Sequence, residues 1–262
     1  MHASLAERAP ARTFCGGSAA DPWAPGRIPV PIFPKALRPM STEILPAVEL
    51  QTGPHPNAAI VWLHGLGADG NDFVPIVNEM RLPATASIRF VFPHAPVRPV
   101  TINNGMRMRA WYDIAAGNLT NRADLDGIRS SQAQLEALIA REKARGIDAA
   151  RIVLAGFSQG GVIALHTGLR HAERLAGIVA LSTYVVTPEA LGADVASANL
   201  TVPIFMAHGT YDPVVRFEWG DASRRALEAA GCRVEWHAYP MQHSVVMEEI
   251  DAIGAFLGRV LA

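Results

Sequence analysis

A serine flanked by glycines is the residue of this chain best placed to do covalent chemistry. Ser158 is the centre of a Gly-Phe-Ser-Gln-Gly sequence at 156–160, between an apolar β-type run and a helical pattern. A serine on such a sharp strand-to-helix turn projects its hydroxyl away from the sheet, and small residues two positions before and after it let neighbouring backbone approach. The amino end of the following helix favours negative charge. The spacing therefore predicts a nucleophile elbow with Ser158 as the nucleophile, and an ordinary glycine-rich turn is the alternative.

A serine hydroxyl is a poor nucleophile unless a base activates it and a third group orients that base. In proteins with this elbow, the acid and the histidine follow the serine in that order along the chain. Asp212 comes after the apolar run 203–207, in a turn-forming Asp-Pro pair, and His243 lies in the loop after the run 233–237. We therefore expect Ser158, Asp212 and His243 to form a catalytic triad for acyl transfer.

A second loop is expected to help bind the oxyanion of the reaction. The apolar run 58–63 ends in His64-Gly65-Leu66-Gly67. In enzymes with this elbow, one oxyanion donor comes from such a loop and the other from the residue after the nucleophile. The backbone N–H groups of Leu66 and Gln159 are therefore the expected donors. A plain βα turn is the alternative for this loop.

The other histidines are assigned no catalytic role. His208 lies before Asp212 and close to the end of its strand, so a packing or hydrogen-bonding role is expected. His237 falls within a strand pattern. Although His64, His94 and His208 could converge at strand ends, no spacing typical of metal ligands accompanies them. We expect no metal site and no cofactor.

Short apolar runs alternate with helical patterns from Pro46 onward. Buried strands are expected at 58–63, 88–92, 151–155, 177–181, 203–207 and 233–237. Helices are expected at 126–145, with Asp126 as N-cap and Gly146 as the stop, and at 159–170, 217–230 and 244–260. Such alternation indicates a mostly parallel sheet with helices on both faces, as in the α/β-hydrolase fold.

Residues 1–40 differ from the rest of the chain, because they hold seven of its 19 prolines. Proline at this density disfavours helices and central strands. We expect a disordered or non-native N-terminal extension over 1–40, or translation that begins at Met40. One α/β-hydrolase domain is expected over 41–262.

The composition restricts the class of partner. The 262 residues are 50% hydrophobic and 18% charged, with a net charge of -1 and no basic block, which argues against nucleic-acid binding. No apolar run approaches the roughly 20 residues that cross a bilayer, so no integral membrane association is expected. Two cysteines cannot form a disulfide framework, and a cytoplasmic location is the expectation. A homodimer is left open.

The chain resembles the phospholipase/carboxylesterase family, which includes small bacterial carboxylesterases and acyl-protein thioesterases. The resemblance spans about residues 45–262 and leaves residues 1–40 without a counterpart. It rests on Leu63-His64-Gly65-Leu66-Gly67, Pro93-His94-Ala95-Pro96, Gly105-Met106-Arg107-Met108, Ala110-Trp111-Tyr112-Asp113, Gly156-Phe157-Ser158-Gln159-Gly160-Gly161, His208-Gly209 with Asp212-Pro213-Val214-Val215, and Tyr239-Pro240-Met241 with His243.

This resemblance implies a compact α/β-hydrolase with no large lid, with the triad and the oxyanion donors given above. It also implies that 96–111 is a binding loop beside an acyl groove, with Trp111 and Val214 as substrate-binding wall residues.

We expect a serine carboxylesterase that hydrolyses short- to medium-chain esters of small molecules through an acyl-enzyme. The stretches 98–103 and 111–113 look more like bacterial carboxylesterases than eukaryotic thioesterases. An acyl-protein thioesterase or lysophospholipase is the alternative, because the same triad cleaves oxygen esters and thioesters. A hydrolase-fold binding protein without catalysis is the third hypothesis, and the intact Ser158, Asp212 and His243 argue against it.

Overall fold

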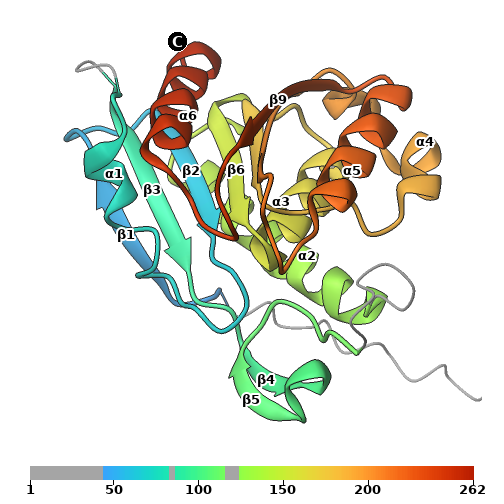
Figure 1. Cartoon of the computed structure of the whole chain (residues 1–262). Helices are drawn as coiled ribbons and strands as arrows, with labels where there is room; N and C mark the ends of the chain where they lie inside the picture. Colours follow the sequence, from blue (N-terminus) through green and yellow to red (C-terminus); the bar gives the residue numbers. More distant parts are fainter. Residues whose placement is uncertain (1–43, 83–85, 116–123) are drawn as a thin grey trace, which may run out of the picture. The chain divides into compact units, whose positions relative to one another are not determined.

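The computed structural model describes residues 44–82, 86–115 and 124–262, so the expected extension at 1–40 lies outside the described residues. Seven strands form one sheet in the order β1-β3-β2-β6-β7-β8-β9 (Figure 1). Only β1 runs antiparallel to its neighbour, and the other pairings in this sheet are parallel. The strands are β1 (Ala47–Gln51), β2 (Ala58–Leu63), β3 (Ile88–Pro93), β6 (Ile152–Phe157), β7 (Gly177–Leu181), β8 (Pro203–Gly209) and β9 (Arg233–Tyr239). The predicted mostly parallel sheet is confirmed.

The central strands are apolar throughout because they are buried on both faces. In β2, Val61 and Leu63 belong to the apolar cluster on one face of the sheet, whereas Ile60 and Trp62 belong to the cluster on the other. Successive side chains of a strand point to opposite faces, so a strand covered on both sides needs a continuous apolar run. This is the pattern that made the central strands recognisable in the sequence.

Helices cover both faces of the sheet (Figure 1). Side chains of α2, α3 and α5 join the apolar cluster on one face, and those of α1 and α6 join the cluster on the other. The helices are α1 (Ile76–Glu79), α2 (Leu125–Ala144), α3 (Gln159–Arg170), α4 (Leu191–Asp194), α5 (Phe217–Ala229) and α6 (Met247–Val260).

The start of α2 corrects one prediction. Asp124, not Asp126, is the N-cap, and its carboxylate accepts the N–H of Gly127 at 2.8 Å. Asp126 instead lies in the first turn, exposed and paired with Arg129. The helix ends as predicted, because Gly146 adopts the left-handed conformation with φ +91°.

Two features of the sheets were not predicted, and neither were the short helices α1 and α4. The edge strand β1 has a mixed burial pattern and lacks the continuous apolar run of the central strands. The other feature is a hairpin, β4 (Val97–Val100) and β5 (Met106–Arg109), in the stretch 96–111 for which the family resemblance implies a binding loop. This hairpin follows the carboxyl end of β3, at the edge of the sheet where the parallel strands end (Figure 1).

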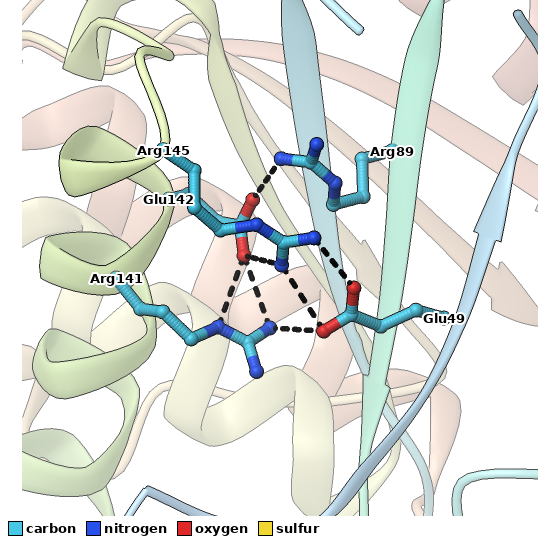
Figure 2. Close-up of polar contacts among 5 residues, drawn as sticks. All are labelled: Glu49, Arg89, Arg141, Glu142 and Arg145. Carbon is cyan, nitrogen blue, oxygen red and sulfur yellow. Dashed lines mark hydrogen bonds and ion pairs between the residues drawn. The ribbon is translucent and has the colours of Figure 1, made fainter. Parts of the chain in front are cut away.

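A cluster of charged side chains ties α2 to the strands β1 and β3 (Figure 2). The buried carboxylate of Glu142 lies 2.8 Å from Arg89 and 3.0 Å from both Arg141 and Arg145. Glu49 of β1 pairs with Arg141 at 2.8 Å and Arg145 at 2.9 Å. Burial alone would raise the pKa of Glu49, but the Arg145 hydrogen bond and the surrounding arginine charges hold it below its ordinary value of 4.5.

The substitution Glu142→Gln should lower the free energy of unfolding by about 3 kcal/mol, because it leaves the buried guanidinium of Arg89 without its counter-charge. Urea unfolding measures this change. The matched control is Glu173→Gln, which breaks an exposed ion pair with Lys143 of the same helix and should change stability little. Equal losses in the two variants would contradict a stabilising role for the cluster.

Candidate active site

The expected nucleophile stands on a strained turn between β6 and α3. Ser158 has φ 54° and ψ −120°, a conformation that costs a non-glycine residue free energy and persists only when its surroundings impose it. Its N–H donates to the carbonyl of Leu181 at 2.8 Å, and its carbonyl accepts the hydroxyl of Thr183 at 2.7 Å. These two bonds to the end of β7 hold the turn, and the serine is 9% exposed.

Two glycines make this turn sterically feasible. A Cβ atom on Gly156 would lie 2.4 Å from the carbonyl of Gly160, and a Cβ on Gly160 would lie 2.4 Å from the carbonyl oxygen of Leu63. Both distances are far shorter than any normal contact. The first turn of α3 therefore packs directly on the carboxyl end of β2, as the requirement for small residues at these positions predicts.

The expected acid and base are in contact. Asp212 Oδ2 and His243 Nδ1 lie 2.6 Å apart, and Asp212 Oδ1 accepts the N–H groups of Val214 and Val215 at 2.8 and 2.9 Å. Because the carboxylate accepts, we assign the proton to Nδ1 of His243, which leaves Nε2 with its lone pair. Nε2 is then the atom available as a base.

The aspartate is stabilised in its ionised form. Burial alone would raise the pKa of Asp212, but the hydrogen bond and charge of His243, together with the N–H groups of Val214 and Val215, bring it below its ordinary value of 3.8. An ionised carboxylate can both orient the imidazole and stabilise its protonated form.

The expected base lies beside the elbow. The ring of His243 is 4.7 Å, centroid to centroid, from the ring of Phe157, the residue before the nucleophile. The loop that carries His243 is joined to the loop after β8, since the N–H of Tyr211 donates to the carbonyl of Met241 at 3.1 Å. The fold therefore brings Ser158, Asp212 and His243 to one edge of the sheet, from the loops after β6, β8 and β9.

The expected oxyanion donors both line a pocket with Ser158. Gln159 is the first residue of α3, so its backbone N–H has no acceptor within the helix. The loop of Leu66 is fixed by its neighbour Gly67, whose N–H donates to the carbonyl of Arg109 at 2.9 Å. The positions are thus suited to the role, which stays a prediction.

The buried side chain of His64 stabilises this loop through hydrogen bonds. Its Nε2 accepts the N–H of Ala95 at 3.1 Å, so the proton belongs on Nδ1, which donates to the carbonyl of Gly65 at 2.7 Å. Burial lowers the pKa of His64 to about 4, which keeps the ring neutral at neutral pH. His64 thus has a structural role in the loop.

The side chain of Gln159 has a structural role that the sequence did not indicate. Its Oε1 accepts the N–H of Trp111 at 2.8 Å, and its Nε2 donates to the carbonyl of Tyr112 at 2.7 Å. The indole N–H of Trp111 donates to the carbonyl of His64 at 2.9 Å. These contacts tie the segment at 111–112 to the elbow across almost 50 positions of sequence, a separation at which no local pattern signals a contact.

The pocket beside Ser158 has a volume of about 240 Å³. Its wall is largely apolar, and the buried hydroxyls of two lining residues, Tyr112 and Tyr184, form a 2.9 Å hydrogen bond with each other. Val214, 56% exposed, is among the lining residues, and its role in substrate binding stays a prediction. Trp111 is 1% exposed and is not among the lining residues, which are Leu66, Ile102, Asn103, Tyr112, Ile114, Ser158, Gln159, Tyr184, Val214 and Val215.

A larger hollow lies at the opposite edge of the sheet. It has a volume of about 340 Å³ and is lined by residues near the amino ends of β2, β3 and β6, among them Asn57, Ile88 and Arg151. It contains neither a serine nor a histidine. The smaller pocket is therefore the candidate active site, because it alone of the two contains Ser158, the expected nucleophile.

The described ranges hold no group of three histidine, cysteine or acidic side chains arranged to bind a metal ion. They also hold no helix long and apolar enough to cross a membrane. Cys232 is buried and unpaired, and burial raises the pKa of its thiol, whereas Cys15 lies outside the described residues.

A buried carboxyl group lies just beyond the loop of His243. Glu249, in the first turn of α6, is fully buried, and neither of its carboxyl oxygens has a hydrogen-bond partner within the described residues. Burial raises its pKa to about 8; the N–H of Val246 opposes this shift without reaching hydrogen-bond geometry. The group is therefore largely protonated at neutral pH.

Glu249 should make the stability of the protein pH-dependent. Its pKa is about 8 in the folded protein and near its ordinary 4.5 in the unfolded chain. Between these values the folded state holds a proton that the unfolded state has lost, so stability falls as pH rises through this window and then levels off. Glu249→Gln should therefore gain stability over the parent as pH increases toward 8.

Thermal unfolding of both proteins at pH 4.5 and pH 8 measures this gain. The control is Glu248→Gln, which removes an exposed carboxylate from the same helical turn and should follow the parent at both pH values. Parallel pH curves for Glu249→Gln and the parent would show that the buried group does not titrate as described.

Comparison with known proteins gives one consistent family. The model of the phospholipase/carboxylesterase family matches residues 45–261. An acyl-protein thioesterase 1 of Neurospora crassa is 41% identical over 223 residues, which are 82% of this chain and 89% of that protein. An acyl-protein thioesterase 1 of Yarrowia lipolytica is 39% identical, and the match covers 79% of this chain and 94% of that protein.

Solved structures agree with this result. SOBER1 of Arabidopsis thaliana is 32% identical with a TM-score of 0.74, covering 78% of this chain and 99% of that one. Acyl-protein thioesterase 2 of Zea mays is 27% identical with a TM-score of 0.73, and the match covers 83% of this chain and 99% of that one. Esterase PE8 is 29% identical with a TM-score of 0.71, and the match covers 83% of this chain and 100% of that one.

Proposed function

The chain belongs to the phospholipase/carboxylesterase family of α/β-hydrolases, and from this premise we propose that it is a thioesterase that removes acyl groups from S-acylated proteins or peptides. It is an ester-hydrolysing serine hydrolase. The sequence favoured a short-chain carboxylesterase, with a thioesterase as the alternative. The relatives of about 40% identity are named acyl-protein thioesterases, and they favour that alternative.

The observation that carries the acyl-transfer mechanism is the 2.6 Å contact between Asp212 and His243, next to a serine on a strained elbow, whereas the named relatives carry the choice of a thioester. In the first step, His243 Nε2 takes the hydroxyl proton of Ser158 while the Ser158 oxygen attacks the thioester carbonyl carbon. The tetrahedral oxyanion is held by the N–H groups of Leu66 and Gln159. The carbon–sulfur bond then breaks, the thiol leaves with the proton from His243, and an acyl-serine remains.

Water completes the reaction. His243 removes a proton from the water as its oxygen attacks the acyl-serine carbonyl, and then returns that proton to Ser158 as the carboxylic acid departs. The apolar pocket beside the serine is suited to an acyl chain, with Val214 in its wall. Because Tyr112 and Tyr184 line this pocket and Trp111 does not, we propose the two tyrosines as its aromatic wall.

A carboxylesterase that cleaves oxygen esters of small molecules is the second candidate. The similarity to esterase PE8, at 29% identity and over the whole of that chain, favours it. Both candidates need the same triad, so only the leaving group and the acyl chain distinguish them.

The triad is tested by Ser158→Ala. We expect hydrolysis of short p-nitrophenyl esters to fall by about 10³-fold or more, with the protein still folded, because the nucleophile of the acyl-enzyme is gone. Labelling by a fluorophosphonate probe, followed by mass spectrometry, should find the adduct on Ser158 and none in the variant. The exposed-serine variant Ser197→Ala should react like the parent. Full activity of Ser158→Ala would refute the assignment of the nucleophile.

The leaving group is tested with one peptide carrying an octanoyl group either on a cysteine sulfur or on a serine oxygen. After division by the hydroxide-catalysed rate of each substrate, kcat/KM for the thioester should be at least about tenfold higher, a barrier difference of about 1.4 kcal/mol. A preference for the oxygen ester would support the carboxylesterase instead. Faster cleavage of a lysophospholipid than of either peptide would support a lysophospholipase.

A further inference from the structure

A fully buried histidine behind the triad has no part in the mechanism above. His208 lies near the end of β8 and is 0% exposed. Its Nε2 is 2.7 Å from the carbonyl oxygen of Val215. A carbonyl oxygen only accepts, so we assign the proton of this ring to Nε2, and Nδ1 has no partner among the described residues. Burial lowers the pKa of His208, which keeps the ring neutral.

The bond from His208 reaches the triad through one residue. The carbonyl of Val215 accepts from His208, while the N–H of Val215 donates to Asp212 Oδ1 at 2.9 Å. The other oxygen of Asp212 holds His243 at 2.6 Å. Because His208 Nε2 itself is 3.7 Å from Asp212 Oδ2, too far for a hydrogen bond, its effect on the aspartate passes through Val215.

The ring of His208 is fixed from the opposite side by α5 and β9. A Cβ atom on Gly220 would lie 2.3 Å from His208 Nδ1, so the backbone of α5 rests directly on the ring. The rings of Phe217 and Trp236 lie 6.0 and 6.3 Å from it, centroid to centroid. The imidazole is thus held between the loop that carries Asp212 and the helix that follows it.

We propose that His208 is a positioning residue, whose neutral Nε2–H holds the Val215 carbonyl so that Asp212 keeps the orientation that aligns His243. Neutrality is part of this role. A charged imidazole beside the carboxylate of Asp212 would compete with His243 for it, and the titratable groups on this chain of contacts are Asp212 and His243. The inference rests on the proposed triad.

The test compares His208→Leu with His208→Gln. Leucine fills much of the volume but has no donor, whereas the amide nitrogen of glutamine can reach the Val215 carbonyl. In His208→Leu we expect kcat for a thioester to fall by about 10- to 100-fold with a smaller change in KM, because a misplaced triad slows chemistry more than binding. His208→Gln should recover most of the lost kcat.

The pH–rate profile separates positioning from general damage. A less well-placed Asp212 stabilises protonated His243 less, so the acid limb of kcat/KM should move to lower pH in His208→Leu and return in His208→Gln. If the leucine variant does not fold, Gly220→Ala replaces it, since its methyl group displaces the ring but keeps the donor. It should shift the acid limb in the same direction.

The inference is overturned if folded His208→Leu, or Gly220→Ala in its place, keeps the kcat and the acid limb of the parent. It is also overturned if His208→Gln loses as much activity as His208→Leu. Failure of the proposed triad gives a different result, namely full activity in Asp212→Ala, and failure of the thioesterase proposal gives a preference for the oxygen ester. These outcomes are therefore distinguishable.

Discussion

The architecture of the site depends on one close approach, that of the first turn of α3 to the carboxyl end of β2. With 2.4 Å between a hypothetical Cβ of Gly160 and the carbonyl oxygen of Leu63, no side chain fits at this position. This contact brings the loop of Leu66 and the start of α3 close to each other, so that both border the same pocket as Ser158. The strained φ of Ser158 is held by its bonds to the end of β7.

The buried histidines near this site have structural roles, which distinguishes them from the expected catalytic histidine. His64 and His208 are buried, each donates one ring N–H to a backbone carbonyl, and burial lowers the pKa of both. His243 differs because its Nδ1 faces the ionised carboxylate of Asp212, which favours a protonated imidazole during reaction. The partner of Nδ1 or Nε2 therefore decides which histidine can act as a base.

The pocket connects this chemistry to a substrate class. Its wall is largely apolar, with the Tyr112–Tyr184 hydroxyl pair as a polar element. An acyl chain suits such a wall, whereas nothing in the triad distinguishes sulfur from oxygen in the leaving group. For this reason the choice between thioester and ester is carried by the relatives, and the acyl-transfer mechanism is carried by Ser158, Asp212 and His243.

The sequence by itself determined the features that local patterns encode. These are the buried runs of the central strands, the glycine-flanked serine, and the positions of Asp212 and His243 after later strands. Only the tertiary structure decided three other features. These are the hydrogen bonds of Gln159 to the segment at 111–112, the burial of Trp111, and the hydrogen bond of His208 to the carbonyl of Val215. The physical reason is that periodicity and turn chemistry act over a few residues, whereas these contacts depend on how separate elements pack.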